Sequence, residues 1–481
     1  MLVRDKAISG LIWNSFDSFA NQGVQLGIGI FLARILSPRE FGLMGMLTIF
    51  IAVSQSLIDS GFSSALIRKK DCTQEDYSTI FYFNLVISIA LYFLLFLLSG
   101  TISSFFNEPQ LKILITVLGI ALVLNSFTII QRTKLTKELN FKIQMYVSTA
   151  ASVISGIIAI VLALNGFGVW SLVALTLCRV GLTSLFFWIW SKWRPVRVFS
   201  KKSFYELFSF GSKLLISGLI DTIYRNVYNL VIGKYFSAVH LGYYAMADQL
   251  QALPSQNLSG IIGRVSYPVL SKIQDDASKL KTAYQRLIKS TMLVSFLSMF
   301  MLAAIAEPMI TAVIGAKWLP SVLYLQLLCF VGMIYPLHAL NLNILQLKGR
   351  SDLFLRLEIQ KKILIIPVIF IGIFWGISIM IVGMIIINII AFYLNSYWAG
   401  EFINYSTLQQ LRDIFPSFLI GLIIGVIVFA LGHFLPVSSW LKLSIQILSG
   451  LTLTIGLSES IKLVDYFYIK GIIFEKLFKK Q

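Results

Sequence analysis

The sequence is poor in charged residues. Aspartate, glutamate, lysine and arginine make up 13% of its 481 residues, whereas hydrophobic residues make up 57%. Because an average soluble chain carries roughly 25% charged residues, this chain has too little polar surface to fold in water. Its apolar residues gather in runs of about 18 to 25, the length of a helix that crosses the hydrocarbon core. We therefore predict an all-α membrane protein with many spans, since the segments of a β-barrel would be about 10 residues long and alternate in polarity.

Cysteine and histidine are also scarce. The chain has three of each, spread along its length: Cys72, Cys178, Cys329, His240, His338 and His433. No pair has the spacing of a disulfide framework or a metal site, and we interpret the histidines as structural. The sequence also lacks a G-x-x-x-x-G-K-[ST] phosphate loop, an H-E-x-x-H motif and a nucleophile elbow. These absences predict that the protein is not an enzyme and uses no cofactor or metal.

The apolar runs predict fourteen spans joined by short loops. They lie near residues 10–34, 41–66, 78–99, 111–131, 145–164, 167–190, 208–233, 240–264, 287–306, 320–346, 360–376, 378–398, 414–433 and 440–458. The longest loop is expected around residues 271–286, which leaves no room for a separate soluble domain. We divide the chain into a first six-helix bundle (1–199), a second six-helix bundle (200–400), and two trailing helices with a basic amphipathic tail (401–481).

Positive charge alternates between the loops. The chain has 40 lysines and arginines against 22 acidic residues, a net charge of +18. Most of these cations fall in loops on one side of the predicted membrane, and the opposite loops hold only Arg34, Arg39, Lys112, Lys234, Lys317 and Lys442. Because positively charged loops stay in the cytoplasm, we predict cytoplasmic N- and C-termini in the cytoplasmic membrane. The basic excess then faces anionic membrane lipids, and no nucleic acid is indicated as a partner.

One segment of the chain recurs. "IFLARILSPREFGLMGM" from Ile30 is repeated as "LVIGKYFSAVHLGYYAM" from Leu230, an offset of 200 residues that matches Ser37 with Ser237 and Gly42 with Gly242. Both copies join the first span of a half to its second. With six spans in each half, the two copies have the same orientation in the membrane. Parallel repeats of this kind are typical of secondary transporters.

Polar side chains at intervals of three or four residues mark one face of the first and the seventh span: Asn14, Asp17, Asn21 and Gln25, then Lys213, Ser217, Asp221, Arg225 and Asn229. The offset of 200 directs both stripes toward a cleft between the two bundles. Other spans add further polar residues, namely Gln55, Asp59, Arg179, Asp248, Gln251 and Asn257. Ionisable residues within a membrane usually face a cavity or a partner, because burying them in hydrocarbon costs a few kcal/mol.

These residues suggest two kinds of site. Arginine binds phosphate oxygens through paired, charge-assisted hydrogen bonds, so we predict a substrate-binding set of Arg179, Arg225, Lys213, Asn21, Gln25 and Asn229. The candidates for binding a coupling ion are Asp17, Asp59, Asp221 and Asp248. Structural alternatives stay open: Asp221 and Arg225 are spaced as an i,i+4 pair, polar side chains can join neighbouring helices, and Lys213 is close to the membrane surface.

The opening segment "AISGLIWNSFDSFANQGVQLGIGIFLARILSPREFGLMGML" resembles the first helical hairpin of bacterial polysaccharide exporters. These Wzx-like oligosaccharide flippases form the polysaccharide-transporter branch of the multidrug/oligosaccharidyl-lipid/polysaccharide exporter superfamily. The later "RNVYNLVIGKYFSAVHLGYYAMADQLQALP" and "YPVLSKIQDD" are similar to the matching region of the second half. The resemblance covers the whole chain, including its 6+6+2 arrangement of spans.

The resemblance implies a flippase in a bacterial inner membrane, and because one chain contains both bundles we expect it to be a monomer. Its substrate would be a polyprenyl-pyrophosphate-linked oligosaccharide, a repeat unit of a surface polysaccharide or lipopolysaccharide, moved from the cytoplasmic to the periplasmic leaflet by alternating access. Membrane lipids and enzymes of polysaccharide polymerisation or assembly are the implied partners. In this family, basic residues of a cavity between two bundles are thought to meet the pyrophosphate.

Other functions stay open. An ion-coupled exporter of small molecules from the same superfamily would use the aspartates to bind its ion. A membrane-embedded polysaccharide polymerase or ligase would need a large periplasmic loop, whereas the longest external segment expected here is near residues 307–319. A scaffold for a polysaccharide assembly complex would not require the polar stripes.

Overall fold

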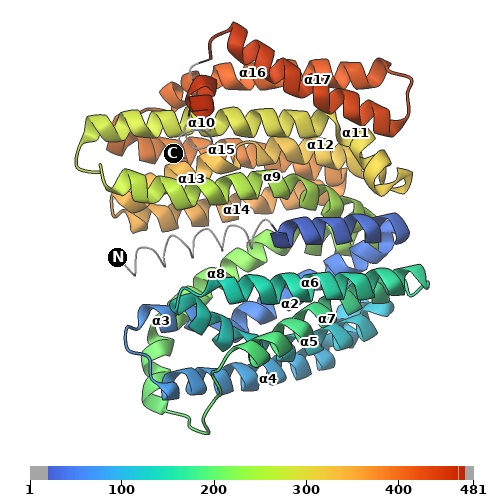
Figure 1. Cartoon of the computed structure of the whole chain (residues 1–481), viewed down its shortest axis with the longest axis vertical. Coiled ribbons are helices and arrows are strands. Elements are labelled where there is room, and N and C mark those ends of the chain that lie inside the picture. Colours follow the sequence, from blue (N-terminus) through green and yellow to red (C-terminus); the bar gives the residue numbers. More distant parts are fainter. Residues whose placement is uncertain (1–19, 464, 472–481) are drawn as a thin grey trace, which may run out of the picture. The chain divides into compact units, whose positions relative to one another are not determined.

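The computed structural model describes residues 20–463 and 465–471 (Figure 1). All regular elements in these ranges are helices, which confirms the predicted class. The chain divides into two compact units, Met1–Gly242 and Tyr243–Gln481, here called unit 1 and unit 2 and described separately. The boundary does not coincide with residue 200, where we expected the second bundle to begin, because the helix that follows residue 200 packs within unit 1.

Unit 1 is a bundle of long helices with one short helix at a bend. After the helical residues 20–35, its elements are α2 (Pro38–Asp59), α3 (Phe62–Arg68), α4 (Gln74–Phe106), α5 (Gln110–Lys137), α6 (Phe141–Leu164), α7 (Val169–Trp190) and α8 (Lys201–Tyr235). Helix α4 lies along α5, α6 along α7, and α2 along α8. The start of α9 (Ala238–Ser271) also belongs to this unit, and the rest of α9 continues into unit 2.

Unit 2 contains the remaining helices. They are α10 (Ala277–Ala304), α11 (Ala306–Met309), a π-helix (Ile310–Ile314), a 3-10 helix (Ala316–Trp318), α12 (Ser321–Gly332), α13 (Tyr335–Leu347), α14 (Ser351–Trp375), α15 (Ile377–Ile403), α16 (Thr407–Phe434) and α17 (Ser439–Ser460). Helix α10 packs along α16, and α14 packs along α15 (Figure 1). Of the tail that we expected to be amphipathic, residues 465–471 are helical, and those beyond 471 lie outside the described residues.

Eleven helical segments of the described chain are long and apolar enough to cross a membrane. The pair α12 and α13 forms one of them, as the predicted span 320–346 requires. Helices α9 and α14 are long enough but are not counted among these segments, because each contains too many polar or charged residues. Helix α14 carries the polar run Glu358, Gln360, Lys361 and Lys362, and α9 carries Asp248 together with two prolines.

Several helices extend beyond the predicted spans. Helix α14 begins at Ser351, whereas the apolar run begins near residue 360. The expected loop of about 20 residues around 271–286 is wrong, since only residues 272–276 separate α9 from α10. Apolar character marks the part of a helix that sits in hydrocarbon, but the backbone stays helical beyond it where good helix formers continue.

The two copies of the repeated segment have the same local structure. The first helix ends at residue 35 and α2 starts at Pro38, whereas α8 ends at Tyr235 and α9 starts at Ala238. In the first copy Ser37 is the N-cap of α2 and forms a capping box with Glu40. In the second, the Ser237 hydroxyl accepts a hydrogen bond from the backbone N–H of His240 at 3.2 Å. The break and the cap thus recur at an offset of 200 residues.

Two glycines let these copies touch within unit 1. A Cβ atom at Gly42 would overlap the backbone carbonyl of Ala238, and a Cβ atom at Gly242 would overlap that of Pro38. Gly42 and Gly242 are equivalent positions of the two copies, and so are Pro38 and Ala238. The two contacts are therefore equivalent. Glycine is required at both positions because the helix backbones approach too closely for any side chain.

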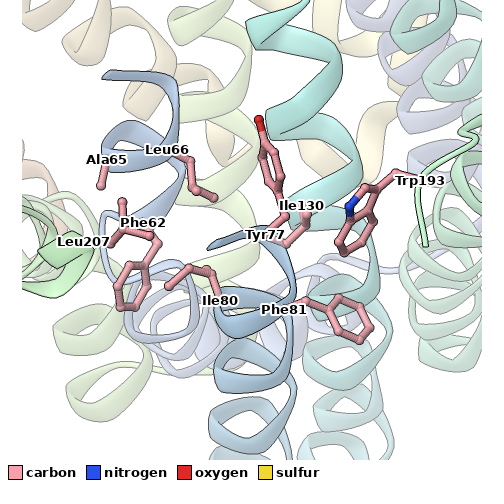
Figure 2. Close-up of a cluster of buried hydrophobic side chains, with 9 residues drawn as sticks. All are labelled: Phe62, Ala65, Leu66, Tyr77, Ile80, Phe81, Ile130, Trp193 and Leu207. Atoms are coloured by element: carbon pink, nitrogen blue, oxygen red, sulfur yellow. The ribbon is translucent and has the colours of Figure 1, made fainter. Parts of the chain in front are cut away.

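A buried cluster joins the start of α8 to α3, α4 and α5 of the same unit (Figure 2). Phe62 of α3, Ile80 of α4, Ile130 of α5 and Leu207 of α8 meet in it, and their van der Waals packing associates these four helices. Beside the cluster, the Lys69 ammonium lies 3.1 Å from the Asp76 carboxylate and 3.0 Å from that of Glu206. Burial opposes the charged form of Lys69, but the two carboxylates outweigh it and raise the pKa of this lysine.

Candidate functional site

Unit 1 contains a polar cavity of about 330 Å³. It is lined by side chains of the first helix, α5, α6 and α7: Asn21, Gln25, Asn125, Thr128, Arg132, Ser148, Ser152, Arg179, Val180 and Thr183. All of them except Val180 are polar or charged. A cavity with this lining offers hydrogen bonds and positive charge to a ligand.

Asn21 holds the first helix against α6. Its amide group donates to the Ser148 hydroxyl at 2.8 Å, and its amide oxygen accepts from the Ser152 hydroxyl at 3.1 Å. Further along the same pair of helices, a Cβ atom at Gly156 would overlap the Ile28 side chain. Small residues and interhelical hydrogen bonds are the usual means of close helix association in membranes. Asn21 therefore shapes the cavity wall as well as lining it.

Arg179 is the charged centre of this cavity. It is half-buried, and its guanidinium makes no hydrogen bond or ion pair with the part of the chain that the structure describes. Thr183, one turn further along α7, donates its hydroxyl hydrogen to the backbone carbonyl of Arg179 at 2.7 Å. A cation that is partly withdrawn from water without a counter-charge is unfavourable, so this position favours an anionic ligand.

Arg132 of α5 is a second cation on the same lining. Its exposed side chain also has no ion pair within the described ranges. Sequence reasoning missed this residue because we counted it among the cytoplasmic loop cations. The signal was present, since Asn125, Thr128 and Arg132 follow one another at helical intervals of three and four residues. At the start of this row, the Asn125 amide donates to the Gln55 side-chain oxygen of α2.

The predicted stripe on α8 is placed differently. Lys213, Arg225 and Asn229 do not line the cavity of Arg179. The Arg225 Nε atom lies 2.8 Å from the Asp221 carboxylate, the i,i+4 ion pair that we kept as an alternative. Both side chains are well exposed, at 62% and 46%. The structure therefore brings together Arg179, Asn21 and Gln25 of the predicted set and leaves the α8 residues apart.

The four acidic candidates do not form a group. Asp17 lies outside the described residues. Asp59 accepts hydrogen bonds from Ser63, from its hydroxyl at 2.5 Å and its backbone N–H at 3.3 Å, and so caps α3. Asp221 pairs with Arg225. Asp248 of α9 is exposed and makes no ion pair with any described residue, and no cluster of potential metal ligands was found in the described ranges.

Comparison with known proteins identifies relatives over most of the chain. Residues 31–323 match the model of the family described as polysaccharide biosynthesis protein. The teichuronic acid biosynthesis protein TuaB of Bacillus subtilis (strain 168) is 27% identical over 460 residues, covering 93% of this chain and 94% of TuaB. The lipopolysaccharide biosynthesis protein WzxC of Escherichia coli (strain K12) is 29% identical over 376 residues, covering 77% of this chain and 76% of WzxC.

The fold has counterparts among solved structures. The lipid II flippase MurJ in its inward closed conformation matches 95% of this chain and 100% of its own, with a TM-score of 0.77 and 17% identity. An inward-facing multidrug resistance transporter of the MATE family matches 80% of this chain and 94% of its own, with a TM-score of 0.64 and 19% identity. The helices of this chain thus follow the arrangement found in MurJ and MATE proteins.

Proposed function

Because the chain belongs to the polysaccharide biosynthesis family, the Wzx-like branch of the multidrug/oligosaccharidyl-lipid/polysaccharide exporter superfamily, we propose that it flips a lipid-linked oligosaccharide. Proteins of this family are multi-pass membrane transporters of polysaccharide biosynthesis. The proposed substrate is a polyprenyl-pyrophosphate-linked oligosaccharide. It moves from the cytoplasmic to the periplasmic leaflet by alternating access, and no covalent bond is made or broken.

The observation that carries this proposal is the pair of cations without counter-charge in the polar cavity of unit 1. Arg179 and Arg132 both line it, and neither has an ion pair among the described residues. A guanidinium can bind two oxygens of a pyrophosphate at once through parallel charge-assisted hydrogen bonds. Asn21, Gln25 and Thr183 on the same lining supply the neutral polar groups that a sugar hydroxyl needs.

The physics of the substrate favours such a cavity. Each polar group that enters hydrocarbon without a hydrogen-bond partner costs several kcal/mol. Several sugars and a pyrophosphate therefore cannot cross the bilayer unaided, whereas the polyprenyl tail need not leave it. A passage lined by polar side chains and arginine lowers this barrier, and the protein has to supply only binding and movement.

The proposal includes fourteen spans in two parallel halves, with both termini in the cytoplasm. The eleven candidate spans, the helix that contains residues 20–35, α9 and α14 together make this number. The equal helix breaks at residues 36–37 and 236–237, and the reciprocal contacts of Gly42 and Gly242, support the duplication. A reporter fused after Gln481 should read as cytoplasmic, and a periplasmic signal would refute this topology.

Substitution of Arg179 tests the function. In the native host with its own copy deleted, we expect Arg179→Ala to lower the surface glycan at least about tenfold, since one charge-assisted contact is worth 1.5 kcal/mol or more. Lipid-linked oligosaccharide should accumulate on the cytoplasmic leaflet, and Arg179→Lys should restore part of the export. The control is Arg39→Ala, which removes an exposed ion pair with Glu108 and should leave export unchanged. Normal export by a fully inserted Arg179→Ala protein would overturn the proposal.

A further inference from the structure

Unit 2 has a cavity where the starts of α10 and α16 meet the segment that follows α17. Its volume is about 430 Å³, within the range of roughly 300 to 1,000 Å³ that is usual for ligand pockets. We call it the interfacial pocket. Its lining consists of Thr282, Gln285, Arg286, Lys289, Arg412, Asp413, Pro416, Leu463 and Asp465. Three of these side chains are cations and two are acids, so the pocket presents both signs of charge.

The interfacial pocket lies where charged residues give way to apolar ones along two membrane-spanning helices. Lys289 is the last lysine, arginine or acidic residue of α10, and Asp413 is the last of α16. Both helices are candidate spans, and both continue with apolar turns beyond these residues. Such a change of polarity marks the boundary between the hydrocarbon core and the headgroup region. The pocket is therefore at the level of the lipid headgroups.

Two of the five charged side chains of the lining neutralise each other. The Lys289 Nζ atom lies 3.0 Å from the Asp413 Oδ1 atom. The hydroxyl of the fully buried Tyr405 donates to the Asp413 Oδ2 atom at 2.8 Å. Each carboxylate oxygen of Asp413 thus has a partner of its own, and this pair needs nothing from a ligand.

The other three charged side chains have no such partners. Arg286, Arg412 and Asp465 make no hydrogen bond or ion pair with the residues that the structure describes. Arg286 lies over the Tyr468 ring, 5.0 Å from its centroid, a contact that holds a guanidinium without using its N–H donors. Asp465 is half-buried, and its burial raises its pKa, although the charges of Lys289 and Arg286 act against this rise. Two guanidinium groups and one carboxylate are thus available to a ligand.

An apolar surface on α16 continues from the pocket. Leu411, Phe415 and Leu419 follow one another at intervals of four residues, and their side chains are exposed. Because successive residues of a helix are turned by about 100°, this row lies beside the face that carries Arg412 and Pro416. Acyl chains can cover such a row while the polar group attached to them reaches the pocket.

We propose that the interfacial pocket binds the headgroup of an aminophospholipid, that is, a lipid with a phosphate and a primary ammonium group. The phosphate contacts Arg286 and Arg412, since guanidinium groups bind phosphate oxygens through charge-assisted hydrogen bonds. The ammonium group contacts Asp465, and the acyl chains lie along α16. Basic pockets between membrane helices bind anionic headgroups, but an anionic lipid would leave the half-buried carboxylate of Asp465 without a partner. The carboxylate therefore favours a zwitterionic headgroup.

Lipid binding to the purified full-length protein tests this proposal. The protein in detergent is titrated with dioleoyl phosphatidylethanolamine, phosphatidylglycerol or phosphatidylcholine, and bound lipid is measured by native mass spectrometry. Phosphatidylglycerol has no ammonium group, and the methylated ammonium of phosphatidylcholine has no N–H donor. We therefore expect phosphatidylethanolamine to bind at least about tenfold more tightly than either, as the loss of one charge-assisted hydrogen bond predicts. Equal or tighter binding of phosphatidylglycerol would overturn the proposal.

Two substitutions connect the preference to the pocket. Asp465→Asn should remove it, so that phosphatidylethanolamine binds no more tightly than phosphatidylglycerol. Arg412→Gln should weaken the binding of both lipids by about tenfold, because it removes a contact with the phosphate that they share. The matched controls are Asp275→Asn and Arg356→Gln, which change exposed residues of unit 2 outside the lining and should leave binding unchanged. A preference that persists in Asp465→Asn would show that the pocket does not recognise the amine.

Two further measurements separate the alternatives. Soluble phosphoethanolamine has the same charged groups without acyl chains, and it should not displace the lipid at equal concentration. If it does, the pocket takes a soluble ligand and the lipid proposal is wrong. Arg179→Ala changes the cavity of unit 1 and should bind phosphatidylethanolamine normally. Failure of the flippase proposal would therefore leave this inference standing, and loss of the lipid preference would leave the flippase proposal untouched.

Discussion

Two arginines of unit 1 were predicted on the same grounds, and the structure gives them opposite surroundings. Arg179 of α7 is half-buried in a polar cavity and has no counter-charge among the described residues. Arg225 of α8 is 62% exposed and pairs with Asp221 at 2.8 Å. The difference follows from their neighbours one turn away. Arg225 has an aspartate four residues before it, whereas Arg179 has only Leu175, Thr176, Leu182 and Thr183 within the same reach.

This comparison shows when a membrane arginine is available to a ligand. An i,i+4 acid neutralises it within its own helix, and exposure further weakens what it can contribute. An arginine without such a neighbour must find its counter-charge elsewhere. The cavity that Arg179 lines is a place where a substrate could provide that charge.

The largest effect is expected from giving Arg179 the partner that Arg225 has. Thr183→Asp places a carboxylate four residues after Arg179, on the lining of the same cavity. We expect it to neutralise the guanidinium and lower glycan export by at least about tenfold, comparable to the loss of a charge-assisted hydrogen bond. Export is measured as surface glycan per inserted protein.

Thr183→Asn is the matched control for that experiment. It has nearly the same shape as the aspartate but no charge, and it should retain most of the export. If both variants lose export equally, the loss comes from packing around α7 and the comparison of the two arginines breaks down.

The close contact of the two repeat copies should have the next largest effect. Gly42→Ala and Gly242→Ala each force a Cβ atom against a backbone carbonyl, and overpacking of this kind costs roughly 1 to 3 kcal/mol. We expect similar losses of thermal stability from both, because the contacts are reciprocal. Gly263→Ala, where a Cβ atom meets nothing within 4 Å, is the control. Unequal losses would argue against equivalence of the two copies.

The asparagines of the two polar stripes offer a smaller contrast. Asn21→Leu removes the hydrogen bonds to Ser148 and Ser152, and we expect unfolding to become easier by about 1 to 2 kcal/mol. Asn229→Leu on α8 removes a half-buried side chain outside the cavity, and its effect should stay within about 0.5 kcal/mol. Denaturant titration in detergent measures both. A larger loss from Asn229→Leu would show that the α8 stripe carries helix packing.

Much of the architecture was predictable because hydrophobic run length determines which segments enter a bilayer. The helical class, the multi-pass membrane character and the family were all predicted correctly from the sequence and the resemblance. Helix ends were predicted less well. The length of an apolar run does not include polar turns of the same helix, such as residues 351–361 of α14. The predicted helices were therefore too short and the predicted loops too long.

The lining of the cavity in unit 1 could be anticipated only in part, because its residues come from helices that are far apart in the sequence. Asn21, Gln25 and Arg179 could be recognised as polar residues within apolar runs. Arg132 was assigned to a loop because the predicted span ended one residue before it. The hydrogen-bond partners of His338, Asn388 and Asn395, could not be predicted because they lie 50 and 57 residues further along the chain. A pattern within one helix cannot reveal which helices become neighbours.

The smallest effect is expected from freeing Arg225. Asp221→Asn breaks an exposed i,i+4 pair, and such pairs contribute about 0.3 to 0.5 kcal/mol. Stability should therefore hardly change. Export should stay within about twofold or rise, because an unpaired Arg225 becomes available to an anionic headgroup while Arg179 keeps its own role. A loss of export as large as that of Thr183→Asp would mean that the Asp221 carboxylate itself is needed. The α8 stripe would then be a second functional region, and the two arginines of unit 1 would differ in the partner they work with rather than in their importance.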